Sequence, residues 1–124
     1  MRNLVVAACL VLGISLLGGA VPVAKVQPMS PGAFWVWIQN TEACAFDNFK
    51  VVFVPTGIKV SALVINGPTV KSVDVKSNVV TVTLNGGLKT GGWLVLGVTG
   101  VPANFTADNL LKYKEAFTIP PRCR

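Results

Sequence analysis

The 124-residue sequence contains no histidine and only five acidic residues, against eleven lysines and arginines. Without histidine, the Ser-His-Asp and Cys-His arrangements of nucleophilic enzymes are absent. Two carboxylates that face each other across a cleft would be needed for a glycosidase, and the acids nearest in sequence are Glu42 and Asp47. We therefore expect no enzymatic activity, no cofactor and no bound metal.

The chain also lacks an apolar run long enough to cross a bilayer. Its longest run, Leu4–Leu17, has about 14 residues where a spanning helix needs about 20. Arg2 precedes this run, and the small residues Gly18 and Ala20 follow it at the −3 and −1 positions of a cleavage site. We interpret residues 1–20 as a cleaved signal peptide and expect a secreted or cell-surface protein, extracellular or periplasmic, without a stable membrane anchor.

Two other interpretations of this segment stay open. The first is an anchor that is not cleaved. The second is lipidation at Cys9, because Val6–Cys9 is similar to a bacterial lipoprotein cleavage box. Only about five apolar residues would precede that cut, which is short for an export signal.

Removal of the signal leaves two cysteines, Cys44 and Cys123. In an oxidising compartment such a pair forms a disulfide by default. The closed loop of roughly 80 residues would stabilise the fold by about 4 kcal/mol in the chain-entropy model. No C-x-x-C spacing is present, so a redox role is not expected.

The positive charge is scattered along the chain. Without Arg2, ten lysines and arginines face five acids, which gives a net charge of +5. No block of five or six like charges occurs, so the sequence predicts no basic arm. Export argues against nucleic acid as the normal partner. Solvated strand faces and protected sheet edges explain scattered lysines; the alternative is weak attraction to an anionic surface.

Short segments rich in β-branched and aromatic residues, separated by Gly, Pro and Asn, fill the remainder of the chain. This pattern predicts one all-β domain, residues 33–124, folded as an antiparallel immunoglobulin-like β-sandwich of about seven strands. The expected strands are Ala33–Gln39, Asn48–Val54, Lys59–Asn66, Thr69–Lys76, Asn78–Leu84, Gly92–Thr99 and Lys112–Ile119. Residues 21–32 hold three prolines and predict an extended arm or linker.

Two further local expectations concern turns. Thr69–Lys76 is expected to pair with Asn78–Leu84 through a turn near Ser77, since Val80, Val82 and Leu84 alternate with Thr81 and Thr83. Asn104–Leu111 lacks a strand pattern and is compatible with one helical turn. Asn104 also begins an N-glycosylation acceptor pattern, which matters only in a eukaryotic host.

Two neighbouring segments carry a resemblance. Ser77–Leu84, followed by Leu88–Leu96 with its L-x-x-G-G loop, resembles the last hairpins of bacterial exported immunoglobulin-like or cohesin-like sandwich modules. The resemblance covers about a quarter of the mature chain and concerns the fold. It implies a module of the kind used for adhesion, scaffolding or carbohydrate binding, and a fold of this kind does not select among them.

Three tryptophans are the candidate binding residues. Trp35 and Trp37 share one face of their strand, and Phe34, Val36 and Ile38 share the other. Both faces are apolar, so two interpretations stay open: the tryptophans fill the core together with Trp93, or they form an exposed platform or partner interface.

We therefore weigh three functions. The leading one is a secreted, non-catalytic binding or adhesion module that recognises a cell surface, an extracellular protein or a glycan through Trp35, Trp37 and Trp93. The second is a self-associating structural subunit, joined through its arm or an apolar sheet face. The third is a small secreted enzyme that uses Glu42 or Asp47.

Overall fold

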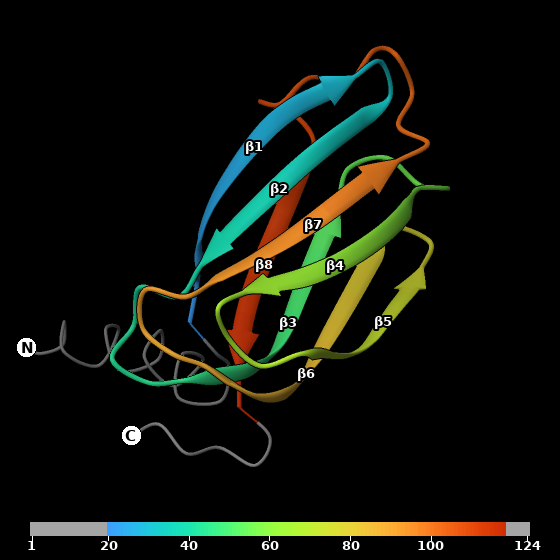
Figure 1. Cartoon of the computed structure of the whole chain (residues 1–124). Coiled ribbons are helices and arrows are strands. Elements are labelled where there is room, and N and C mark those ends of the chain that lie inside the picture. The colour runs from blue at the N-terminus through green and yellow to red at the C-terminus, as the bar shows by residue number, and fades with distance from the viewer. Residues whose placement is uncertain (1–19, 119–124) are drawn as a thin grey trace, which may run out of the picture.

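The structure is a computed structural model, and it describes residues 20–118. These residues form two packed four-stranded antiparallel sheets, shown one behind the other in Figure 1. One sheet has the order β1-β2-β7-β4 and the other β5-β6-β3-β8. The strands are β1 Val23–Ser30, β2 Ala33–Gln39, β3 Phe46–Phe53, β4 Lys59–Ile65, β5 Val70–Lys76, β6 Val79–Leu88, β7 Trp93–Thr99 and β8 Leu111–Phe117.

The hydrophobic core lies between the two sheets. Alternate side chains of every strand point inward, as the two-residue period of a strand requires. The central strands supply most of the fully buried side chains, which are Val36 and Ile38 of β2, Leu94, Leu96 and Val98 of β7, Phe49, Val51 and Phe53 of β3, and Val80 and Val82 of β6. The predicted all-β antiparallel sandwich is therefore confirmed, with eight strands in place of about seven.

The extra strand is β1, which corrects the prediction of an arm for residues 21–32. β1 pairs with β2 in antiparallel register from Val23 opposite Gln39 to Ser30 opposite Ala33. Its proline, Pro28, lies within the strand, and a proline is tolerated there because β1 is at the edge of its sheet. Gly32, with a φ of 77°, makes the turn into β2.

The predicted hairpin between β5 and β6 is confirmed. The two strands pair from Lys76 opposite Val79 outward, and Ser77 makes the turn with a φ of 60°. The alternation along β6 also holds, since Val80, Val82 and Leu84 are buried. β6 continues past Leu84, the last residue of the predicted strand, and Leu88 still pairs with Phe46 of β3.

No helical turn forms between β7 and β8. The segment 100–110 contains only turns, one of which is closed by Thr106, whose backbone N–H donates to Oδ1 of Asn109 at 2.7 Å. Across residues 20–118 there is no helix long and apolar enough to cross a membrane. The signal-peptide prediction for residues 1–20 and Cys123 lie outside the described part of the chain, apart from Ala20.

Candidate functional site

The three tryptophans lie together on the outer surface of the β1-β2-β7-β4 sheet. Trp35 and Trp37 project outward from β2, because Phe34, Val36 and Ile38 take the inward positions and are at most 5% exposed. Trp93 begins β7, the neighbouring strand, and is half-buried like the other two. Of the two interpretations left open by the sequence, the core role for the tryptophans is wrong.

Outward positions that lie opposite each other in the strand pairing extend this surface across all four strands. Lys25, Trp37, Val95 and Leu63 form one cross-strand row, and Val23, Gln39, Trp93 and Ile65 form the next. Leu63 and Val23 are each 50% exposed and Ile65 is 36% exposed. We call the outward positions Val23, Trp35, Trp37, Leu63, Ile65, Trp93 and Val95 the aromatic face. Of these, Val95 is buried, at 3% exposed.

Trp37 and Trp93 are in direct contact. Their ring centroids are 6.1 Å apart and their planes meet at 84°, an edge-to-face arrangement that aromatic pairs prefer. Since the two rings are nearly perpendicular, they do not present a shared flat surface. A sugar ring that stacks on one of them would not stack on the other.

Trp35 lies over the glycine of the next strand. Gly97 is directly opposite Trp35 in the register, and a Cβ added there would be 3.2 Å from Cζ3 of Trp35 and 3.0 Å from Oγ of Ser61. The missing side chain therefore makes the space in which the indole lies flat against the sheet. Such cover of a strand glycine by an aromatic ring stabilises a sheet.

One indole nitrogen on this face has no partner. Nε1 of Trp37 is the buried side-chain polar atom without a hydrogen bond among the residues that the structure describes. A buried N–H donor without an acceptor costs about 1–3 kcal/mol. Apolar contacts thus hold Trp37 in place, and its indole N–H is left without a hydrogen bond.

All charged residues on the strands of this sheet are positive. The four strands contain two charged residues, Lys25 on β1 and Lys59 on β4, and both are exposed. No carboxylate accompanies them on these strands. The aromatic face is therefore an apolar centre with a cationic rim.

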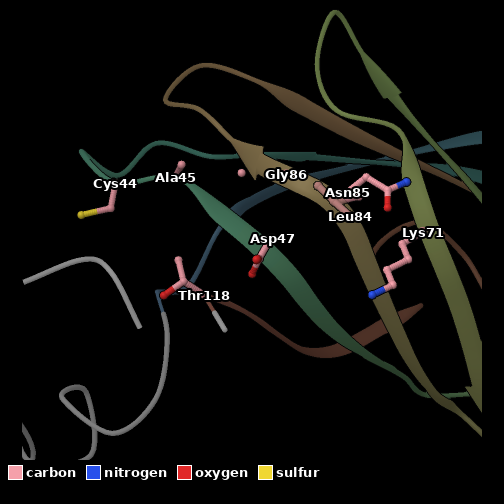
Figure 2. Close-up of a pocket in the computed structure, with 9 residues that line it drawn as sticks. Cys44, Ala45, Asp47, Lys71, Leu84, Asn85, Gly86 and Thr118 are labelled. Carbon is pink, nitrogen blue, oxygen red and sulfur yellow. The ribbon is translucent and has the colours of Figure 1, made fainter. Parts of the chain in front are cut away.

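A second feature is a pocket of about 470 Å³ at one end of the other sheet (Figure 2). Figure 2 shows Lys71 and Asn85 on one side of this pocket and Cys44 and Thr118 on the other. Asp47 of β3 also lines it. The amide of Asn85 is already used, since its Nδ2 donates to Oγ1 of Thr69 at 2.8 Å.

The pocket does not assemble the acids that a glycosidase needs. Asp47 lines it, but Glu42 is not among its lining residues. Glu42 lies in the turn after β2, where its backbone N–H donates to Oδ1 of Asn40 at 2.8 Å and its carbonyl accepts from the Thr90 hydroxyl. No group of three His, Cys, Asp or Glu side chains suited to a metal occurs within residues 20–118.

Cys44 is half-buried in the turn that precedes β3 and forms part of the pocket wall. Its expected partner, Cys123, lies beyond the last described residue, so the disulfide stays a prediction. The turn is held by Asn40, whose Nδ2 donates to the carbonyl oxygens of Cys44 at 2.7 Å and of Leu88 at 2.8 Å. These bonds fix Cys44 between β2 and β6.

No protein-family model, no curated protein and no solved structure matches this chain. Function therefore has to be inferred from the surfaces of the chain itself. The structure adds Val23, Leu63, Ile65 and Val95 to the tryptophans found in the sequence. Only strand register could reveal them, because they lie on three different strands.

Proposed function

We propose that this chain is an exported, non-catalytic binding module that contacts an apolar partner surface through its aromatic face. The observation that carries the proposal is the outward position of three tryptophans beside Leu63 and Ile65, in a small domain that has a separate core. Contiguous exposed apolar surface on a small domain marks an interaction site. Tryptophan is also enriched among the residues that dominate binding energy.

The geometry favours an apolar surface over a flat glycan as the partner. Stacking on sugar rings needs exposed indole faces that lie parallel, and Trp37 and Trp93 are nearly perpendicular. The aliphatic neighbours Leu63 and Ile65 offer no hydrogen-bonding groups for sugar hydroxyls. An adhesion role at a cell surface fits this chemistry where that surface is apolar protein or lipid.

The test compares binding to two defined surfaces, octyl-agarose and crystalline cellulose. We expect the protein to bind octyl-agarose, and the double variant Trp35→Thr/Trp37→Thr to bind at least tenfold more weakly, which corresponds to about 1.4 kcal/mol. The matched control is Thr81→Ala/Thr83→Ala on the other sheet, which leaves binding unchanged. Equal binding by both variants, or binding to cellulose alone, would contradict the proposal.

We further propose that Cys44 and Cys123 form a disulfide in the exported protein. The bond would attach the C-terminal end of the chain to the turn held by Asn40. Peptide mapping without reduction is expected to recover the two cysteines in one linked fragment. Two separate thiol peptides would show that the pairing is absent.

A further inference from the structure

Four strands lie at the edges of the two sheets: β1, β4, β5 and β8. An edge strand leaves a row of backbone N–H and C=O groups without strand partners, which is a template for pairing with another chain. Natural sheets block such edges with proline, bulges, charged side chains, inward-pointing charges or a covering segment. The four edges of this sandwich differ in how they are blocked.

Two edges carry bulges together with other devices. β1 contains Pro28, and its register with β2 shifts between Pro28 and Ser30. β5 has a register shift between Val70 and Ser72, and its outward positions include the charged residues Asp74 and Lys76.

The β8 edge is blocked by an inward-pointing charge. Lys114 lies opposite Val51, a core residue, and so takes an inward position on an edge strand.

β4 has only one of these devices, a charged side chain at its first residue. Its pairing with β7 is regular from Lys59 opposite Thr99 to Ile65 opposite Trp93, without a shift. Its seven residues, KVSALVI, include no proline, and their one charge stands at the first position. Among the described residues, β4 is bonded on one side only, by β7.

We propose that β4 pairs antiparallel with β4 of a second copy of this chain, which joins the two four-stranded sheets into one of eight strands. The proposal goes beyond the binding function above and does not depend on it. A two-fold axis at Ala62 places Ser61 opposite Leu63 of the second copy, both outward, and Val60 opposite Val64 of the second copy, both inward. Inward and outward positions therefore match across the junction.

The charge of β4 does not oppose a second copy as the occupant. In this arrangement the two Lys59 side chains lie at opposite ends of the paired strands, about 20 Å apart over six residues. This separation exceeds the Debye length of about 8 Å at physiological salt, so their repulsion is screened. A two-fold interface uses the same patch on both copies, and β4 is such a self-complementary patch.

Pairing also brings the two aromatic faces together. Leu63 and Ile65 are at the rim of this face in one copy. In the pair they lie at the junction, with Leu63 opposite Ser61 and Ile65 opposite Lys59 of the second copy. A partner surface would then meet one eight-stranded sheet with both sets of tryptophans and with a lysine at each end of the junction.

The experiment measures molar mass by light scattering on the exported protein under oxidising conditions, from about 1 μM to about 1 mM. We expect the mass to double across this range. The variant Ser61→Lys/Leu63→Lys places like charges directly opposite each other across the junction and is expected to raise the dissociation constant at least tenfold. Ser61→Glu/Leu63→Lys places opposite charges there, and is expected to keep the dimer.

Ser72→Lys, at an exposed position of β5, is the matched control and leaves the dimer intact. Hydrogen exchange of the β4 amides in the unmodified protein is a second measurement, with protection that rises with concentration. A monomer throughout, or concentration-independent exchange in β4, would overturn the proposal. So would an unchanged dimer in Ser61→Lys/Leu63→Lys, or equal weakening of the two double variants.

Discussion

The two sheets of this sandwich present very different outer surfaces. The β1-β2-β7-β4 sheet shows the aromatic face with two lysines and no acid. The β5-β6-β3-β8 sheet shows hydroxyls and charges of both signs, with Lys50 opposite Thr81 on one side and Glu115 on the other. Both sheets contribute apolar side chains to the core, so the core does not account for the difference between the outer faces, which indicates that these faces have different roles.

Side chains of the polar outer surface hydrogen-bond to one another. Nδ2 of Asn48 donates to Oγ1 of Thr83 at 3.2 Å across the β3–β6 pair. On the aromatic face the cross-strand contacts are apolar, and one donor, Nε1 of Trp37, is left without a partner. The polar outer surface is stable in contact with water. Burial of the aromatic face against a partner would lower the free energy, because it removes apolar area from water.

The largest expected effect follows from removal of an indole at the centre of the aromatic face. Trp37→Ala loses the ring contact with Trp93 and is expected to lower the free energy of unfolding by about 2–3 kcal/mol. Trp37→Phe keeps a ring there and deletes the unsatisfied donor, so its cost is expected to stay below about 1 kcal/mol. Urea unfolding measures both.

One outcome for the two Trp37 variants would contradict this account. Equal loss of stability in Trp37→Ala and Trp37→Phe would mean that the indole N–H matters more than the ring contact. That result would contradict the account of Trp37 as a residue held by apolar packing.

A smaller effect is expected at the glycine below Trp35. Gly97→Val places methyl groups where Trp35 and Ser61 already lie within 3.2 Å of a Cβ, and the displaced indole is expected to cost about 1–2 kcal/mol. Thr81→Val on the polar sheet introduces the same valine without adding bulk, because it exchanges a hydroxyl for a methyl group, and is expected to alter stability by less than about 0.5 kcal/mol. Thermal unfolding of both variants tests this contrast; equal losses would refute it.

The smallest effect concerns Tyr113 on the polar sheet. Partial burial of the ring, and then the charge and hydrogen bond of Glu115, raise the pKa of Tyr113 above its ordinary value. The folded state therefore holds this proton more tightly. The stability it contributes is complete below the ordinary tyrosine pKa of about 10 and is lost as pH rises through the higher folded value.

Glu115→Gln is expected to lower the pKa of Tyr113 but not to restore it fully, because the contribution of burial remains. Tyr113 is the only tyrosine of the chain, so alkaline titration of the tyrosinate absorbance reports on it alone. An unchanged midpoint in Glu115→Gln would show that the carboxylate does not act on this hydroxyl.

The sequence alone predicted the strands whose two faces differ in polarity. β6 is the clearest example, because Val80 and Val82 alternate with Thr81 and Thr83, so only one face can be buried. β2 was different: its alternation separates Trp35 and Trp37 from Phe34, Val36 and Ile38, but both sets are apolar. Which set is buried depends on the strands placed beside β2, and that information is non-local.

Two other features could not be predicted from the local sequence, because they too depend on which strands lie side by side. The prolines near β1 indicated an arm, and the strand forms because its position at a sheet edge tolerates Pro28. Leu63 and Ile65 joined the candidate site only through their register with Val95 and Trp93. Turn residues and alternation predict strands, whereas a surface shared by several strands requires the topology.

The most direct test of the account is the solvent exposure of the aromatic face in dilute solution. A neutral paramagnetic agent added to the protein broadens NMR signals of side chains that water can reach. The account predicts broadening of the Leu63 and Ile65 methyl signals and the Trp35 ring signals, while those of Val36 and Leu96 stay sharp. If Leu63 and Trp35 are as protected as Val36, the tryptophans belong to a core and the proposed binding surface does not exist.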